Sequence, residues 1–339
     1  MVDRASQEAL VDQYVREDKA EKAVKLLFDL IVEYAREKDF QKAEALNEKL
    51  YEVDPMALTE IVRAGEIIEE AKSESLDKEH LDIWADLYNK LTAAEGNALY
   101  YSMKSKAFEA GEPICEQGQI SNRLFFINKG EVKAVFSREN REVLLKTLGV
   151  GDIFGQDQFF SATVCTVSLV PLSKIKVNWL ESSVLKKWKN DAPALEPKLF
   201  DYCRQRDKVK KALEDKGMER RESPRVPLSG KIAFQILDPA GKSLGKIYKG
   251  EMSDLSAGGL SYLLKTSKPE SVRMLLGRQL NIKFDLVPGD GKDRVPVDRI
   301  GQVIAVQSQA FDDYSIHLKF EIPLNESLIE SIQPDKKKT

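Results

Sequence analysis

Glycine and proline are distributed unevenly along this 339-residue chain, and their distribution constrains the fold more than any other feature. No glycine occurs before Gly65 and no proline before Pro55, and this first part is rich in Ala, Leu, Glu and Lys, which favour helices. From Lys106 onward, glycines interrupt short runs of β-branched and aromatic residues, a pattern typical of successive hairpins. We therefore expect a multidomain α+β protein in which helices precede β-rich domains.

The length of the chain supports this division, because 339 residues exceed one ordinary core and suggest two or three domains. We expect a helical interaction domain over 1–100, a β-roll over 101–180, a helical connector over 181–217 and a second β-rich domain over 218–335. The connector has apolar residues at roughly helical spacing among several lysines and arginines.

The composition is that of a globular protein, with 42% hydrophobic residues, 32% charged residues and a net charge of −3. This charge argues against a general affinity for nucleic acid or for an anionic membrane. Cys115, Cys165 and Cys203 have no CxxC spacing, and only His80 and His317 could supply imidazole, so we expect neither a zinc site nor a disulfide framework. Neither a signal-like amino terminus nor an apolar run of about 18 residues is present, which predicts a cytoplasmic location.

The sequence of the first helices contains an internal repeat with an offset of twenty residues. The residues Tyr14, Arg16, Glu17, Lys22, Ala23, Leu26 and Leu30 recur as Tyr34, Arg36, Glu37, Lys42, Ala43, Leu46 and Leu50. The second copy resembles the second helix of a tetratricopeptide repeat, although the offset does not match that family's period of about 34. This part is either a degenerate repeat that binds an unknown protein partner or a small bundle held by plain hydrophobic packing.

A recognisable glycine-punctuated pattern extends from Lys106 to about Leu180. Its markers are Phe108 to Ile114, Gln117-Gly118, Leu124 to Ile127, Gly130 to Val132 and Gly151-Asp-Ile-Phe-Gly155. The pattern resembles the cyclic nucleotide-binding domain of catabolite-activator-type regulators, which implies a β-roll.

The ligand residues implied by this resemblance are incomplete. The family places a Glu directly after the Phe-Gly pair for the ribose hydroxyl, but here Gln156 follows Phe154 and Gly155. The family also places an Arg several residues later to bind the cyclic phosphate. Here residues 147–173, which include Thr163, contain no Arg or Lys, so this cation is missing. We expect a degenerate roll used for packing, oligomerisation or relay. Cyclic AMP binding in a non-standard mode around Phe154, Gly155, Gln156 and Thr163, with a lysine from elsewhere, stays open as the alternative.

Two arginines and a later Asp-Leu-Ser-Ala-Gly-Gly run form the third pattern. Arg221 and Arg225 stand four apart, and Arg can grip phosphate bidentately and stack on a base. Asp254 can accept hydrogen bonds from a guanine edge, and Ser256 can donate or accept. Gly258 and Gly259 allow close backbone approach or a positive φ. Arginine pairs on solvated helices and Asp-x-Ser turns are also common, so either half alone is a weak signal.

Together these residues resemble the RxxxR and D/NxSxxG motifs of PilZ domains, receptors for cyclic di-GMP. The resemblance implies a six-stranded barrel with a closing helix over about 218–335, and Arg220 implies a contact to an intercalated ligand dimer. The expected strands are Lys231–Leu237, Lys246–Met252, Leu260–Leu264, Gln279–Leu286, Gly301–Val306 and Tyr314–Phe320, followed by a helix from Asn325 to about Ile332.

Enzymatic interpretations find little support. Two Glu-Ala-Leu triplets, at residues 8–10 and 44–46, match the signature of cyclic di-GMP phosphodiesterases but lie in helix-forming sequence without an α/β barrel of about 250 residues. We expect no cofactor, no metal and no catalysis. We expect instead a homo-oligomeric receptor for cyclic di-GMP. In this receptor Gly217 is either a hinge or a helix cap. The alternatives are a dual receptor that also binds cyclic AMP and a DNA-binding regulator, although the helix-turn-helix of the catabolite-activator family has no counterpart after the connector.

Overall fold

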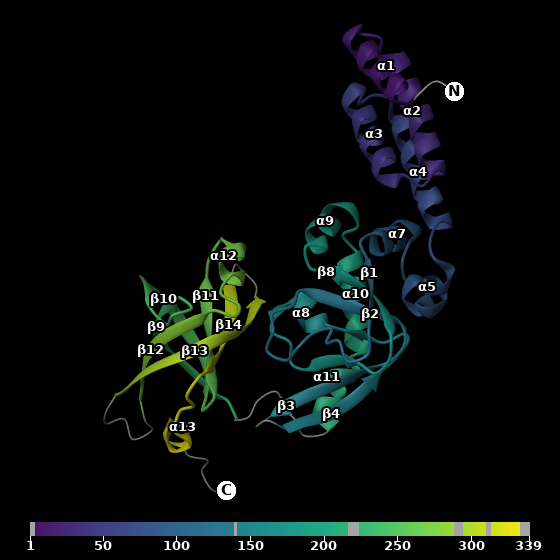
Figure 1. The fold of residues 1–339 in the computed structure, drawn as a ribbon. Helices are drawn as coiled ribbons and strands as arrows, with labels where there is room; N and C mark the ends of the chain where they lie inside the picture. Colours follow the sequence, from purple (N-terminus) through teal and green to yellow (C-terminus); the bar gives the residue numbers. More distant parts are fainter. Residues whose placement is uncertain (1–3, 139–140, 216–223, 288–293, 310–312, 333–339) are drawn as a thin grey trace. The chain divides into compact units, whose positions relative to one another are not determined.

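The computed structural model describes residues 4–138, 141–215, 224–287, 294–309 and 313–332. These residues form two compact units. One holds the residues up to Met103 together with Leu185–Leu199, and the other holds Lys104–Val184 and the residues from Phe200 onward. The expected α+β class, with helices first, is confirmed (Figure 1).

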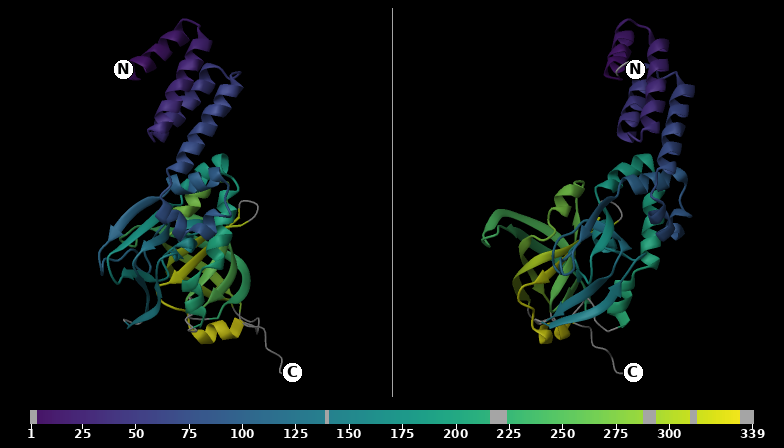
Figure 2. Two further views of the ribbon diagram at one scale, coloured as in Figure 1. Left: turned by 90° about the vertical axis from the view of Figure 1, so that its right-hand side faces the viewer. Right: turned by 45° about the vertical axis from the view of Figure 1, so that its right-hand side comes forward.

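The first unit begins with helices that pack side by side (Figures 1 and 2). They are α1 (Arg4–Arg16), α2 (Ala20–Arg36), α3 (Phe40–Val53) and α4 (Leu58–Glu74), followed by α5 (Lys78–Ile83), α6 (Ala85–Tyr88) and α7 (Ala93–Tyr101). Ala23, Ala43 and Ala64 are completely buried where the first helices meet. Small side chains at these points let the helix backbones approach closely.

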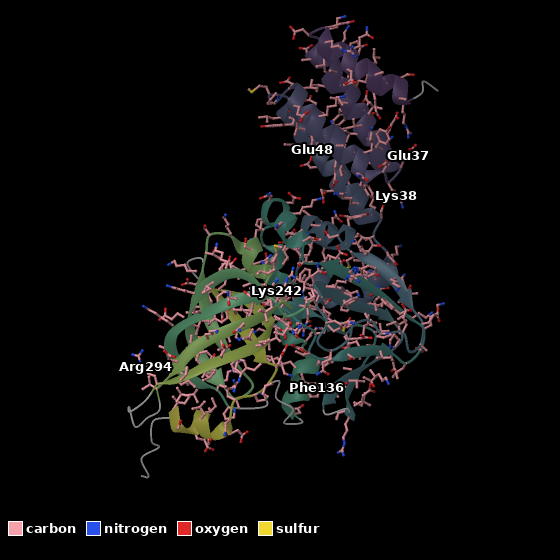
Figure 3. All side chains as sticks on the ribbon, turned by 60° about the vertical axis from the view of Figure 1, so that its left-hand side comes forward. Glu37, Lys38, Glu48, Phe136, Lys242 and Arg294 are labelled. Atoms are coloured by element: carbon pink, nitrogen blue, oxygen red, sulfur yellow. The ribbon has the colours of Figure 1, made fainter. Side chains whose placement is uncertain are left out.

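The internal repeat in the sequence corresponds to the same cap at the C-terminal ends of two helices. Asp18 and Lys38, twenty residues apart, both have positive φ, at 56° and 65° (Lys38 is labelled in Figure 3). In each copy the next backbone N–H donates to the carbonyl five residues earlier, from Lys19 to Tyr14 and from Asp39 to Tyr34. This is the hydrogen bonding of a Schellman cap. Each copy of the twenty-residue repeat therefore consists of one helix and the turn that ends it.

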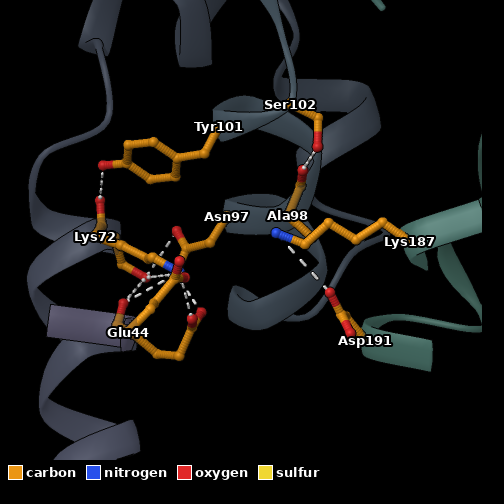
Figure 4. A network of polar contacts seen from close by, with 10 residues as sticks. Glu44, Lys72, Asn97, Ala98, Tyr101, Ser102, Lys187 and Asp191 are labelled. Carbon is orange, nitrogen blue, oxygen red and sulfur yellow. Dashed lines mark hydrogen bonds and ion pairs between the residues drawn. The ribbon is translucent and has the colours of Figure 1, made fainter. Parts of the chain in front are cut away.

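A buried lysine joins three helices of the same unit (Figure 4). The Lys72 ammonium on α4 contacts Glu44 on α3 and lies 2.9 Å from the Glu69 carboxylate, and the Tyr101 hydroxyl on α7 donates to the Lys72 carbonyl at 3.0 Å. The pKa of Lys72 is raised: burial favours the neutral amine, but its two carboxylate partners outweigh this effect. The unit also includes α9 (Val184–Asp191) and the first turn of α10 (Leu195–Gln205).

The second unit opens with a β-roll, as the sequence predicts. Its strands are β1 (Lys104–Phe108), β2 (Arg123–Lys129), β3 (Val132–Arg138), β4 (Arg141–Leu148), β5 (Ile153–Phe154), β6 (Ala162–Thr163), β7 (Ser168–Pro171) and β8 (Ile175–Glu181), with helix α8 (Gln156–Phe160) between β5 and β6. One sheet has the order β1-β8-β2-β5 and the other β4-β3-β7. Helix α11 (Lys208–Asp215) adds Leu213 to the core of the roll, and its Lys208 ammonium lies 2.5 Å from Asp152.

A closed barrel of six antiparallel strands follows and confirms the predicted architecture. The strands are β9 (Val226–Leu237), β10 (Ser243–Ser256), β11 (Gly259–Lys265), β12 (Gln279–Leu286), β13 (Val295–Ser308) and β14 (Asp313–Phe320). They pair in the order β12-β9-β10-β11-β14-β13, and the pairing of β12 with β13 closes the ring. Helix α12 (Pro269–Arg273) precedes β12, and α13 (Glu326–Ile332) adds Ile329 and Ile332 to the barrel core.

Strands β9, β10 and β13 are longer than the sequence predicts, and two differences from the expectation bear on the candidate sites. Strand β10 continues through Ser256, because Asp254 pairs with Ser261 across the hairpin, so the Asp-x-Ser motif lies in a strand and not between strands. In addition, the short strand β6 of the roll pairs with β13 of the barrel, Thr163 opposite Ala305. The Val164 N–H donates to the Ile304 carbonyl at 3.1 Å beside this pair. The roll and the barrel thus share a sheet.

Candidate functional site

An ion pair brings the arginine motif and the Asp-x-Ser motif of the barrel together. Arg225 directly precedes β9, whose first residues, Val226 and Pro227, pair with Leu255 and Asp254 of β10. Arg225 Nη1 donates to Asp254 Oδ1 at 2.6 Å, and the two side chains are only 17% and 26% exposed. The strand register therefore places the two polar groups in contact although 29 residues separate them in sequence.

Serine and histidine side chains extend this cluster onto β11 and β14. Ser261 Oγ donates to the second oxygen of Asp254, and the hydroxyls of Ser253 and Ser261 lie 2.8 Å apart. Arg225 Nη1 also lies 3.5 Å from His317 Nδ1, and Ser315 lies 3.3 Å from the other ring nitrogen.

The sequence interpretation missed Ser261, Ser315 and His317 as members of the cluster. The signal for Ser261 was present, since a two-residue turn at Ala257-Gly258 places Ser261 opposite Asp254.

Ser256 and Gly259 build the turn beside the cluster. The buried Ser256 hydroxyl donates to the Gly259 carbonyl at 3.0 Å. A Cβ at Gly259 would lie 2.1 Å from the Leu318 carbonyl oxygen, so glycine is required there by the approach of β14. A Cβ at Gly258 would meet nothing within 4 Å, and neither glycine is among those with positive φ.

Two residues of the predicted site, Arg220 and Arg221, lie outside the described residues, as does Gly217, the predicted hinge. The described part of the site therefore consists of one arginine of the RxxxR motif and the complete Asp-x-Ser-x-x-Gly motif. The hydrogen bonds described for the Arg225 side chain leave from Nη1.

The roll contains a cavity of about 520 Å³. Phe154, Gly155, Gln156 and Thr163, the four residues proposed from sequence, all line it. Gly155 has φ of 90°, and a Cβ there would lie 2.3 Å from the Arg123 carbonyl oxygen, so only glycine fits this corner between β5 and α8. The resemblance to cyclic nucleotide-binding domains thus selected residues that line one cavity.

Other segments complete the cavity wall and were not predicted. Arg123 comes from β2, Asp207 directly precedes α11, Lys210 lies in α11, and Gln307 comes from β13 of the barrel. Lys210 is a lysine contributed from elsewhere in the chain, which the sequence interpretation had left open. The contribution of Gln307 could not be read from the sequence, because it depends on how β13 packs against the roll.

Cys115 and Cys165 both line this cavity. A hydrogen bond with Cys165, together with burial, holds the pKa of Cys115 well above its ordinary value. The same hydrogen bond lowers the pKa of Cys165. Within the described ranges, no group of three or more His, Cys, Asp or Glu side chains is arranged to hold a metal ion, and no helix is long and apolar enough to cross a membrane.

Comparison with known families assigns both β-rich parts. Residues 105–187 match the family model of the cyclic nucleotide-binding domain, and residues 219–333 match that of the PilZ domain. The chain thus carries one domain of each kind.

Individual relatives cover only part of this chain. It is 28% identical over 133 residues to a cGMP-dependent protein kinase of Plasmodium berghei, a match that covers 36% of this chain and 15% of the kinase. It is 26% identical over 104 residues to a CRP-like cAMP-activated global transcriptional regulator of Mycobacterium tuberculosis, covering 30% of this chain and 46% of the regulator. The N-terminal domain of a transcriptional regulator from Streptomyces coelicolor A3(2) superimposes with a TM-score of 0.33 at 23% identity, covering 39% of this chain and 90% of that domain.

Proposed function

We propose that this protein is a non-enzymatic receptor for cyclic di-GMP, in which Arg221 and Arg225 bind the phosphates and Asp254 and Ser256 recognise guanine. The observation that carries the proposal is the contact between Arg225 and Asp254 at the start of a PilZ-type barrel. A nucleotide with two phosphates and two bases needs guanidinium donors and carboxylate acceptors side by side.

The partners of Asp254 define how guanine would bind. One carboxylate oxygen accepts from Arg225 and the other from Ser261, yet a carboxylate offers about four lone-pair sites. Base N–H groups can therefore add to these contacts without breaking them. The pairing also fixes the carboxylate in place, so that it lies ready for the base edge.

Signalling would follow from where the arginines sit in the chain. Helix α11 ends at Asp215, Arg225 directly precedes β9, and Arg220 and Arg221 lie between them. We call the segment that carries Arg220 and Arg221 the arm. A ligand held by both Arg221 and Arg225 would close the arm onto the barrel and reposition the domains, because the ligand binds the closed arrangement more tightly than the open one. If Arg220 adds a contact, an intercalated ligand dimer and a stoichiometry of two to one follow.

The helical unit is proposed to bind a protein partner or a second copy of the chain. Its α3–α4 corner exposes four large apolar side chains, those of Tyr51, Met56, Leu58 and Val62, with Met56 82% exposed. Apolar residues gathered at one corner are typical of protein-binding surfaces. No catalytic step is part of this proposal.

Titration calorimetry of the intact protein with cyclic di-GMP tests the proposal. The Arg221→Ala, Arg225→Ala double variant should bind at least ~100-fold more weakly, because each charge-assisted contact contributes about 1.5–3 kcal/mol. Arg273→Ala, at an exposed position of α12, is the matched control and should bind like the parent. Because Arg225 also pairs with Asp254, thermal unfolding of each variant must show a folded barrel. A folded double variant with parental affinity would refute the proposal.

A further inference from the structure

The cavity of the roll carries no net formal charge on the side chains that line it. Its charged lining residues are Arg123, Lys210, Asp157 and Asp207, two of each sign. Arg123 is already engaged, with its guanidinium 5.4 Å from the Trp179 ring centre and 3.9 Å from Glu181. An anion placed deep in this cavity would meet as much negative as positive charge, and burial of a charge without a matched partner is costly.

Two buried polar atoms of the cavity-lining side chains have no hydrogen-bond partner among the residues that the structure describes. Among the buried side-chain atoms of the described residues, Gln156 Oε1 and Thr163 Oγ1 have no hydrogen-bond partner, and Thr163 is only 1% exposed. Buried polar groups are almost always hydrogen-bonded, so two such atoms on one cavity wall indicate a ligand that supplies the missing bonds. The Gln156 oxygen needs an O–H or N–H donor, and the Thr163 hydroxyl can either donate or accept.

The remaining wall is apolar and partly aromatic. The rings of Phe125 and Phe154 stack with their centres 4.6 Å apart, and both residues line the cavity. Val167, Val209 and Leu213 add aliphatic surface. Such a wall suits a flat aromatic ring, and about 520 Å³ lies in the usual range of sites for small ligands.

We propose that this cavity binds an uncharged nucleoside, whose base packs on the apolar wall and whose hydroxyl groups bond to Gln156 and Thr163, in preference to a cyclic nucleotide. A nucleoside combines a flat base with hydroxyl donors and brings no phosphate charge. The site is separate from the PilZ cluster, so this proposal stands or falls independently of cyclic di-GMP binding.

The barrel takes part in the proposed site. Thr163 is the β6 residue that pairs with Ala305 of β13, and Gln307 of the same barrel strand lines the cavity. A ligand bonded to Thr163 therefore holds the strand junction between roll and barrel from the roll side. Occupancy should make this junction more resistant to local opening.

Calorimetry of the intact protein with base-matched ligand pairs tests the proposal. Adenosine is compared with cyclic AMP and guanosine with cyclic GMP, so that members of a pair share the base and differ at the cyclic phosphate. At least one nucleoside should bind at least ~10-fold more tightly than its cyclic nucleotide, which corresponds to about 1.4 kcal/mol. Tighter binding of the cyclic nucleotide, or no saturation by either nucleoside at about 1 mM, would overturn the proposal.

Two substitutions identify the site. Thr163→Val keeps the shape and strand preference of the side chain but removes the hydroxyl, and Gln156→Leu removes the acceptor. Each should weaken nucleoside binding roughly fivefold, since each loses one hydrogen bond. Thr147→Val, at an exposed position of β4 away from the cavity, is the matched control and should have no effect. Equal affinities for the Thr163 and Thr147 variants would show that the nucleoside binds elsewhere.

Discussion

The roll and the barrel each present a candidate nucleotide site, and the two sites differ in how far the protein itself satisfies their polar groups. In the barrel, Arg225 and Asp254 bond to each other and to neighbouring side chains. In the roll, the Gln156 and Thr163 side chains line a cavity, and their buried Oε1 and Oγ1 atoms have no hydrogen-bond partner among the described residues. A charged ligand suits the first site, where it can compete for existing charges. An uncharged ligand suits the second, where it completes missing hydrogen bonds.

The barrel glycines offer the prediction with the largest effect. Gly259→Ala should destabilise the protein by about 1–3 kcal/mol or more, because the new Cβ would overlap the Leu318 carbonyl and force β11 and β14 apart. Gly258→Ala is the matched control, since its Cβ meets nothing within 4 Å, and its effect should stay within about 0.5 kcal/mol. Chemical denaturation of both variants gives the comparison. Equal stabilities would mean that Gly259 serves the ligand and not the barrel.

Asp254 tests whether the prearranged ion pair serves the ligand. Asp254→Asn should weaken cyclic di-GMP binding by less than about tenfold, clearly less than loss of the two arginines, because it removes a charge but keeps an acceptor for base N–H groups. Asp285→Asn, at an exposed position of β12, is the matched control for loss of a carboxylate from the barrel. If Asp254→Asn lowered affinity as much as the double arginine variant, the carboxylate would matter more than the phosphate contacts.

The folds could be predicted from the sequence because each depends on local patterns. Gly155 and Gly259 mark corners where a Cβ does not fit, and the alternation along Gln279–Leu286 marks a strand whose bounds the structure reproduces. The sites could be predicted only as far as their motifs extend. His317 joins Arg225 through the register of β14, and Gln307 reaches the roll cavity through contact of two domains. Such contacts between distant segments leave no local pattern in the sequence.

The cysteines give a chemical readout of the roll cavity. Cys165, whose pKa is lowered by Cys115, should react with iodoacetamide at lower pH than Cys115, whose pKa is raised, because only the thiolate reacts. A bound nucleoside should slow both reactions severalfold. Cys203 is the internal control: burial raises its pKa to about 12, and it does not line the cavity, so a nucleoside should not affect it. Mass spectrometry of the labelled peptides measures all three rates. Equal protection of Cys203 would indicate a global effect and not occupancy of the cavity.

Helix α11 connects the two sites, and its response to cyclic di-GMP is the smallest effect that we predict. The helix lines the roll cavity through Val209, Lys210 and Leu213, and the chain continues from its end towards Arg221 and Arg225. If cyclic di-GMP closes the arm onto the barrel, amide hydrogen exchange across residues 205–225 should slow in its presence, because a ligand held by Arg221 and Arg225 restrains the chain that follows the helix. A nucleoside should slow exchange in α11 itself without requiring Arg221 or Arg225. The same two titrations on the double arginine variant separate the effects, since only the response to cyclic di-GMP should disappear. If hydrogen exchange were unchanged at saturating cyclic di-GMP, the barrel would bind its ligand without rearrangement, and the proposed closure would be wrong.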